Sequence, residues 1–291
     1  MQAFLSFSTL LANHPLFGTK HLILAALSYV LCIALFFVVR KWKFRNVCKA
    51  MFYIGIVSEL VKIFYFTIAN EDKFGGILPK TDLPFHLCSI QIIFIAILYL
   101  YNKPKVNKFL LSFMRPSCLF GGIAAILIAT DSSRNGTWVI TAQYFLYHVA
   151  LVVFALYLYG SKEVRFDIKD YFNCLKFLVV LMFFAFYINS ILLDSGYDTG
   201  YNINFMYVAG PPQPNLPYLN DNNGWLSYII RYAVLILGCI SLSYIVPIVN
   251  AIHFALKNRK AAKNADAADN ADTADNVDNV DATENASTTE K

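Results

Sequence analysis

Long apolar runs separated by short polar connections dominate the chain. Seven runs are predicted as helices, at residues 21–39, 49–69, 83–101, 109–129, 138–159, 174–193 and 225–256. Each has about 19 residues or more, against the roughly 20 that a helix needs to cross a hydrocarbon core. The pattern therefore predicts an all-α fold, a polytopic membrane bundle of seven transmembrane helices. The last run is long enough to bend or to extend past the membrane, and Pro247 is the natural place for a bend.

The basic residues alternate between the connections. Lys and Arg cluster within residues 40–49, 103–115, 162–176 and 257–263, whereas the intervening connections hold few and the segment 194–224 holds none. Because cytoplasmic loops retain positive charge during insertion, we expect the N-terminus outside and the C-terminus in the cytoplasm. The expected location is a cell membrane, with the protein multi-pass. Frequent Lys, Asn, Ile and Phe residues suggest an AT-rich bacterial genome, so the expected membrane is a bacterial plasma membrane.

Composition agrees with a membrane domain and sets its limits. Hydrophobic residues make up 57% of the chain and charged residues 15%, below the roughly 25% of soluble domains. The net charge of +5 divides into +12 for residues 1–263 (23 basic, 11 acidic) and −7 for the remainder (one basic, eight acidic). We expect a short extracytoplasmic segment at 1–20, a seven-helix membrane domain at 21–258 and a disordered acidic cytoplasmic tail at 259–291. The tail is either only solubilising or an acidic interaction segment.

Several kinds of function are excluded or disfavoured by missing motifs. The six cysteines are scattered with no CxxC pair, so a disulfide framework is not expected. No HExxH spacing, P-loop or GxGxxG is present, and no metal or other cofactor is predicted. The first apolar run is too long for a cleavable signal peptide, and basic charge follows it. Nucleic-acid binding is excluded because the basic clusters adjoin membrane spans. Membrane lipid is the expected partner, and the oligomeric state stays open.

Polar side chains within the spans are the place to look for chemistry. An ionisable group at the centre of a span costs roughly 2.5–3.5 kcal/mol on insertion scales, so it normally faces the interior of a bundle. The third run opens Asp82-Leu83-Pro84-Phe85-His86-Leu87-Cys88-Ser89, and Pro84 suits the first turn of a helix. His86 and Cys88 are then expected about 5 and 8 Å below the outer end of that helix.

Four or more helices place polar groups at similar depth in the outer half. Lys62, Gln143, Asn189 and Arg231 are expected about 6–11 Å from the outer face, and Glu59 and His148 near 15 Å. A polar chamber opening outward is the economical explanation. Catalytic candidates are His86, Cys88 and His148. Candidates for substrate binding are Lys62, Gln91, Asp131, Gln143, Asn189 and Arg231.

Each candidate has an ordinary structural alternative. Glu59 and Lys62 can neutralise each other, and Arg231 can extend to the headgroups. Gln143 and Asn189 can be interhelical hydrogen-bonding groups, and Cys88 a buried thiol. On a regular helix His86 and Cys88 point nearly opposite ways, so His148 is an alternative base for Cys88. The two histidines differ by about 10 Å in expected depth, and a direct pair needs that gap to close.

The segment from Asp194 to Gly224 lies between the last two runs. It contains Tyr201-Asn202-Ile203-Asn204-Phe205-Met206-Tyr207, followed by Pro211, Pro212, Pro214 and Pro217. A structureless loop of this length is unusual, so we expect it to fold over the bundle as a lid. Its Tyr and Asn side chains contact a headgroup or only fasten the lid.

These motifs resemble a known family. Leu83-Pro84-Phe85-His86-Leu87-Cys88 resembles the LPxHLC signature of the YwaF family of bacterial integral membrane proteins. Tyr144-Phe145-Leu146-Tyr147-His148 resembles the second histidine segment of that family. Asn204-Phe205-Met206-Tyr207 resembles its NYMYL…P segment, with Phe205 in place of Tyr. The similarity covers roughly residues 20–255.

The resemblance implies an activity. YwaF proteins are similar to eukaryotic transmembrane protein 164, a phospholipid acyltransferase, and more distantly to intramembrane Thr/His lipid hydrolases. It implies a lipid acyltransferase or hydrolase acting at the outer leaflet, with His86, His148 and Cys88 in the site. In the similar acyltransferase the cysteine is next to the motif histidine, whereas Cys88 comes two residues after His86. This departure weakens the assignment of Cys88 as the nucleophile more than it weakens the assignment of the histidines. The alternative is a non-catalytic small-solute carrier, sensor or membrane assembly factor that uses the same chamber.

Overall fold

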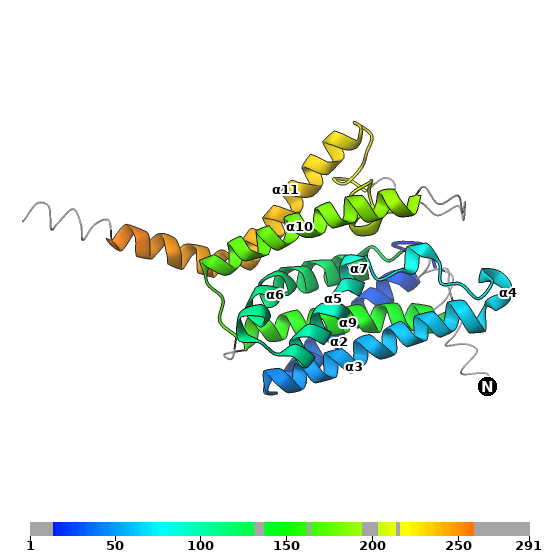
Figure 1. Ribbon diagram of the computed structural model, residues 1–291, viewed down its shortest axis with the longest axis horizontal. Coiled ribbons are helices and arrows are strands. Elements are labelled where there is room, and N and C mark those ends of the chain that lie inside the picture. The colour runs from blue at the N-terminus through cyan, green and yellow to red at the C-terminus, as the bar shows by residue number, and fades with distance from the viewer. Residues whose placement is uncertain (1–13, 131–136, 162–163, 194–202, 214–215, 259–291) are drawn as a thin grey trace, which may run out of the picture. The chain divides into compact units, whose positions relative to one another are not determined.

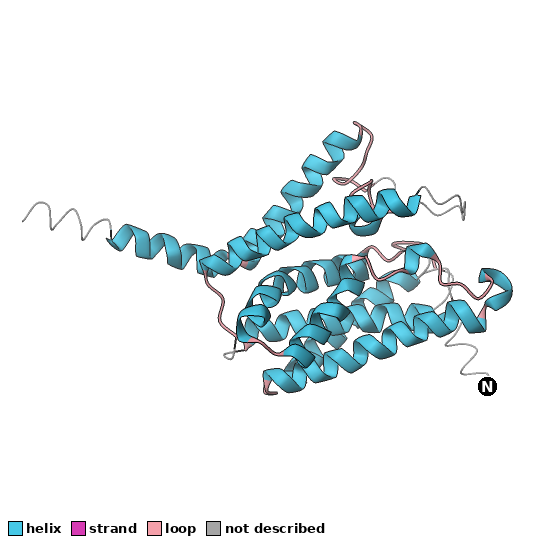
Figure 2. Cartoon of the chain, viewed as in Figure 1, coloured by secondary structure: helices cyan, strands magenta, loops and turns pink. Residues whose placement is uncertain are grey.

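The computed structural model describes residues 14–130, 137–161, 164–193, 203–213 and 216–258 (Figure 1). These residues form helices joined by loops, with no strand among them (Figure 2). The all-α prediction is confirmed. The chain divides into two units, Met1–Ser243 and Tyr244–Lys291. Asp131, the acidic tail and most of the N-terminal segment lie outside the described residues.

Among the described residues, six helices of the first unit are long and apolar enough to cross a membrane. They are α2 (Thr19–Val39), α3 (Phe44–Phe64) with a π-helical turn to Ala69, α6 (Pro104–Pro116) continued through a π-helical turn (Ser117–Gly121) into α7 (Gly122–Leu127), α9 (Trp138–Gly160), α10 (Ile168–Leu193) and α11 (Trp225–Ser243). The third predicted span is shorter: α5 (Leu87–Ala96) and its π-helical turn end at Tyr101. The structure thus supports a multi-pass membrane protein with six candidate spans, whereas seven spans and the orientation of the termini stay predictions.

The start of the third helix differs from the prediction. Pro84 is not in a first helical turn, because the chain forms a 3₁₀ turn at Lys80–Asp82 and then a tight turn at Pro84-Phe85, flanked by Leu83 and His86 in extended backbone. A residue before proline is restricted to extended backbone, and Leu83 has φ −60° and ψ 150°. The helix begins only at Leu87, with His86 as its N-cap residue.

The last helix is also interrupted. α11 ends at Ser243, Tyr244 is in a turn, and residues 245–258 are helical again in the second unit. Pro247 explains the position: its ring clashes with the carbonyl four residues earlier, at Ser243, and it has no N–H to donate. The predicted single run 225–256 is therefore two helical segments, with the break three residues before the proline.

α9 is the central helix of the first unit and lies among α2, α3 and α6–α7 (Figure 1). Its buried side chains pack with those of α2 and α7 in one apolar cluster. Gly122 allows the closest approach, since a Cβ there would lie 2.7 Å from Val152 Cγ2. The outer faces of α2, α3 and α10 carry exposed Leu, Ile, Val and Phe side chains. Such faces suit contact with lipid.

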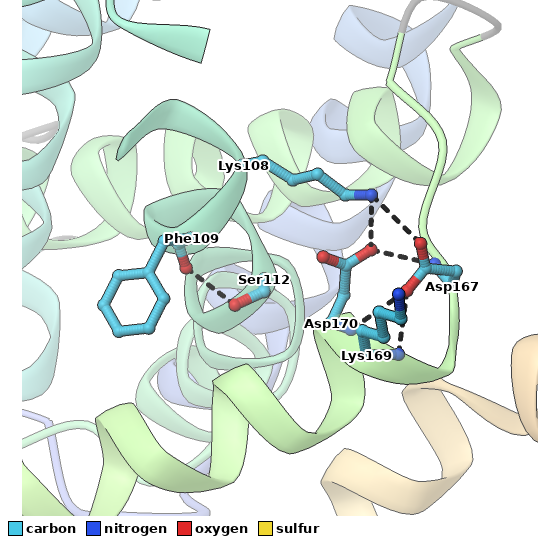
Figure 3. Close-up of polar contacts among 6 residues, drawn as sticks. All are labelled: Lys108, Phe109, Ser112, Asp167, Lys169 and Asp170. Atoms are coloured by element: carbon cyan, nitrogen blue, oxygen red, sulfur yellow. Dashed lines mark hydrogen bonds and ion pairs between the residues drawn. The ribbon is translucent and has the colours of Figure 1, made fainter. Parts of the chain in front are cut away.

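A polar contact joins α6 to the start of α10 (Figure 3). Asp167 Oδ1 accepts from the N–H groups of Lys169 and Asp170, and Asp170 Oδ2 accepts from the N–H of Asp167 at 2.8 Å. This reciprocal pattern is a capping box. Lys108 of α6 contacts both carboxylates, at 3.1 and 3.3 Å. The cap therefore determines where α10 begins, and the contact with Lys108 holds this end of α10 against α6.

Replacing Asp167 by Ala is expected to lower the free energy of unfolding by about 1 kcal/mol, the usual value of an N-cap. Lys169→Ala, which keeps the backbone donor and removes an exposed side chain, is the matched control. Thermal unfolding in detergent measures both. Partial burial raises the pKa of Asp167, but the hydrogen bonds from Lys108 and the α10 amides outweigh it and the net shift is downward. The contribution of Asp167 to the free energy of unfolding should therefore be present near neutral pH and be lost as the pH falls through that lowered pKa. Equal unfolding temperatures for the two variants would contradict the assignment.

Candidate functional site

A cavity of about 380 Å³ lies inside the first unit. Its lining comes from α3, the segment 81–91, α6–α7, α9, α10, α11 and the connection between α10 and α11. The volume is within the range of pockets that hold small-molecule ligands. Polar lining residues gather where α3, the start of α5 and α9 meet, and we call this part the polar end. The remaining lining is largely apolar.

His148 of α9 presents a free ring nitrogen at the polar end. Its Nδ1 is 2.7 Å from the carbonyl oxygen of Tyr144, one turn earlier on the helix. A carbonyl can only accept, so Nδ1 carries the proton and Nε2 has the lone pair. The side chain is 2% exposed, and Nε2 has no hydrogen-bond partner. A buried imidazole of this tautomer that lines a cavity can accept a proton from a bound group.

Gln91 of α5 is the second cavity residue with an unused polar atom. Its Nε2 donates to the carbonyl of Leu87 at 3.2 Å and to Ser117 Oγ at 3.1 Å. Its Oε1 is buried without a partner. The amide thus connects α5 to the π-helical turn of α6–α7 and leaves one acceptor free. Buried polar atoms normally have hydrogen-bond partners, so His148 Nε2 and Gln91 Oε1 are available to a polar group or water in the cavity.

His86 and Cys88 both line the cavity. On a regular helix they would point apart, but His86 is the N-cap residue with φ −68° and ψ 153°, and only Cys88 is within α5. The first N–H groups of a helix have no acceptor in the helix, and no side chain caps α5. These amides and the helix dipole can stabilise negative charge beside Cys88.

The neighbours of this turn hold it in place. The Tyr147 hydroxyl donates to the carbonyl of Cys88 at 2.9 Å, which ties α9 to the start of α5. The His86 ring packs edge-on against Phe205 at 4.9 Å between ring centroids. Among the described residues, no hydrogen bond joins the Cys88 thiol to either imidazole, and the thiol sulfur lies 4.0 Å from Ser89 Oγ.

A charged group lies beside the two histidines. Lys62 of α3 is buried and pairs with Glu59 at 2.9 Å. Asp82 lies near both, and burial raises the pKa of its carboxyl although Lys62 opposes the shift. Gln143 of α9 donates to Ser58 Oγ at 2.6 Å and so joins α9 to α3. The polar end therefore offers one cation and two carboxyl groups to a ligand.

Side chains of α10 and α11 hold the backbone of the connection between these two helices. Four successive carbonyls, of residues 205–208, accept hydrogen bonds from side chains of α10 and α11: Asn189, Tyr232, Tyr228 and Trp225, at 2.6–3.2 Å. Met206 and Tyr207 have left-handed backbone, with φ of 55° and 53°. Such a conformation is costly for these residues and persists only where the surroundings impose it. Residues 205–208 of the expected lid are therefore held by side chains of the flanking helices, and not by the Tyr side chains of the lid itself as the sequence suggested.

Asn189→Leu is expected to lower the free energy of unfolding by about 2–4 kcal/mol. Asn189 both donates to and accepts from the backbone of Phe205, and each buried group left unpaired costs about 1–3 kcal/mol. Ser190→Ala, the next residue on the exposed face of α10, is the control. Chemical denaturation and limited proteolysis within residues 203–213 measure the change. Unaltered proteolysis of Asn189→Leu would show that this contact does not hold the connection.

The structure brings together six of the nine residues proposed from the sequence. Those that line the cavity are His86, Cys88, His148, Lys62, Gln91 and Gln143. Asn189 and Arg231 are not in the lining: Asn189 binds Phe205, and Arg231 donates to the carbonyl of Asn220. Asp131 lies outside the described residues. No group of three or more His, Cys, Asp or Glu suited to a metal occurs in the part of the chain that the structure describes.

Sequence reasoning missed much of the lining. Tyr147 and Tyr207 read as parts of motifs with no assigned contact, and Ser117 gave no signal. The apolar residues from α10 and α11 were indistinguishable from lipid-facing ones. A repeat of Cys174, Leu178 and Met182 every four residues marks one helix face, but any buried stripe has the same spacing.

Comparison with known proteins identifies a family. The model for the TMEM164 family matches residues 16–244. This range includes every cavity residue and leaves out the acidic tail. No curated protein and no solved structure matches the chain significantly.

Proposed function

The chain belongs to the TMEM164 family, and we propose that it is a lipid acyltransferase or lipid hydrolase with its site in this cavity. The single observation that carries the proposal is the unpartnered His148 Nε2, which shares a buried cavity with the Cys88 thiol inside a membrane protein. The motif residues around His86 and His148 also resemble the YwaF branch. On that resemblance we place the protein in a bacterial plasma membrane, with seven spans and the polar end toward the outer leaflet.

The first half-reaction transfers the acyl group to the protein. His148 Nε2 takes the thiol proton of Cys88, and the thiolate attacks the carbonyl carbon of a lipid ester. The amides at the start of α5 stabilise the oxyanion that forms. The ester C–O bond then breaks, and the leaving alcohol takes the proton from His148. The products are a thioester on Cys88 and a lysolipid.

The second half-reaction restores the thiol. A hydroxyl group of an acceptor lipid, or water, gives its proton to His148 and attacks the thioester carbonyl. The C–S bond breaks and Cys88 recovers the proton. The acceptor decides the outcome: a lysolipid gives acyl transfer, and water gives hydrolysis. His86, beside the same turn of α5, protonates the leaving group or stabilises the oxyanion.

The charged residues at the polar end have a binding part in this proposal. Lys62 holds the lipid phosphate, and Gln91 and Gln143 orient the glycerol and ester groups. Asn189 and Arg231, proposed from the sequence for the same purpose, act instead on the connection between α10 and α11. They support the wall of the site without touching substrate.

A non-catalytic binding protein is the second candidate. The observation that favours it is the missing hydrogen bond between the Cys88 thiol and either imidazole among the described residues. A small-solute carrier, sensor or assembly factor would use the cavity without covalent chemistry. It would bind lipid or solute but release no lysolipid.

Reconstituted protein separates the two candidates. Purified wild-type chain in vesicles containing phospholipid with a labelled acyl chain is incubated with unlabelled lysolipid, and lipid products are measured by mass spectrometry. Labelled diacyl product or labelled fatty acid above protein-free vesicles supports the enzyme. Binding of the labelled lipid with neither product would assign the protein to the second candidate.

A further inference from the structure

The part of the cavity beyond the polar end is unused by the proposed chemistry. α10 contributes Cys174, Leu178 and Met182, four residues apart and so on one helix face. α11 contributes Leu235, Cys239 and Ile240, again on one face. We call the space lined by these six residues the apolar arm. It has no charged lining from either helix.

The contacts of the connection fix which way the arm runs. Tyr232 of α11 also lines the cavity and donates to the carbonyl of Met206, whose neighbour Tyr207 packs against His86 at 5.9 Å between ring centroids. Tyr232 therefore lies next to the polar end of the cavity. Ile240 lies eight residues farther along α11, about 12 Å. On α10, Met182 and Cys174 are separated by the same eight residues.

The far end of the arm is closed by packed side chains. Cys174 and Ile240 are buried, and Phe113 of α6 lines the cavity at this level. Phe113 packs against Phe177 of α10 at 4.8 Å between ring centroids, and Phe94 of α5 completes the group. At its side the arm is less enclosed, since Leu235 is 41% exposed. A ligand in the arm would meet an apolar end wall.

These features fit one hydrocarbon chain. The arm lies wholly within helices apolar enough to span a membrane, so burial of a polar solute there would be costly. A closed end also argues against a path through the protein. A lipid whose ester is at Cys88 would leave its acyl chain pointing along the arm.

We infer that the apolar arm holds the acyl chain that is transferred, and that Phe113, Cys174 and Ile240 limit the chain length accepted. The inference rests on the proposed function for its substrate and extends it to specificity. Chains that end before this wall fit without strain. Longer chains have to bend or leave the arm at Leu235.

The test is a competition among phospholipids that differ only in acyl length. Cys174→Phe and Ile240→Phe should shift the kcat/KM ratio toward shorter chains by about tenfold or more, and Phe113→Ala should shift it toward longer chains. The matched controls are Val179→Phe on α10 and Leu237→Phe on α11, which are exposed at 53% and 43%. They should leave the profile unchanged. Active variants at positions 174 and 240 with the wild-type profile would overturn the inference.

A binding experiment keeps the inference separate from turnover and from misfolding. Unmutated protein and His148→Asn protein are irradiated with a phospholipid that carries a diazirine at the end of its acyl chain. Labelled peptides should contain the end-wall residues of α6, α10 or α11 in both proteins. Such labelling without any turnover would support the acyl-chain site in the apolar arm and contradict the proposed enzymatic function. Turnover with labels only on lipid-facing residues such as Val179 would reject the chain site and retain the enzyme.

Discussion

Replacing His148 by Asn is expected to lower the rate of acyl transfer by about 10²–10⁴-fold, the usual contribution of a general base. The Asn amide can still donate to the Tyr144 carbonyl, as Nδ1 does, but it has no group in the position of Nε2. Folding should therefore be retained while the proton acceptor is removed. Steady-state turnover of labelled phospholipid in vesicles measures the loss.

The matched control is His253→Asn, the same change at an exposed histidine of the second unit. Both variants should insert into vesicles and unfold at temperatures close to wild type. If His148→Asn keeps wild-type turnover, Nε2 is not the base. His86 would then be the remaining imidazole in the cavity able to act.

Cys88→Ala is expected to abolish acyl transfer and leave the protein inserted. The thiol is the attacking group in the proposed reaction, and the Tyr147 contact to this turn is to the backbone, so it survives the substitution. Product formation from labelled phospholipid, with lysolipid as acceptor, is the measurement. Cys48→Ala, a buried thiol of α3 outside the cavity, is the control.

The alternative nucleophile gives a different pattern. If Cys88→Ala retains full turnover while the variants of His86 and His148 lose it, the attacking group is water or a hydroxyl. The cavity would then remain a lipid site that uses histidine chemistry. Loss of activity in Cys48→Ala as well would point to general damage by thiol removal.

The membrane helices could be predicted from the sequence because apolar runs of this length have few other stable folds. Their starts were less predictable. α3 begins at Phe44 and α6 at Pro104, each five residues before the predicted run. The added residues carry Lys and Arg, which interrupt an apolar run but are good helix formers. Hydropathy therefore marks the buried part of a helix and not its first turn.

Two prolines show how far the sequence near a proline predicts where a helix begins or breaks. Pro247 was a predicted bend, and the helix breaks at Tyr244 because the ring acts on the preceding turn. Pro84 was placed in a first helical turn, yet it lies in a separate turn before α5, and His86 is in extended backbone. The non-helical backbone of His86 allows its side chain to line the same cavity as Cys88. The regular helix assumed from the sequence predicted the opposite.

The candidate site could be predicted in part from depth alone. Polar residues in spans are rare, and a shared expected depth grouped Lys62 with Gln143; both line the cavity, and so does His148, which was expected deeper. Depth does not give the direction in which a side chain points around its helix. Asn189 and Arg231 have suitable depth but contact the connection between α10 and α11. The apolar arm depends on packing among α6, α10 and α11, which no local pattern encodes.

The most direct test of the account is the covalent state of Cys88. Wild-type protein is incubated in vesicles with phospholipid bearing a labelled acyl chain and no acceptor, quenched in acid, digested and analysed by mass spectrometry. The account predicts that the peptide with Cys88 gains the mass of the acyl chain, and that His148→Asn protein gains far less. Turnover of the labelled lipid with no acyl group on Cys88 at any time of quenching would contradict it.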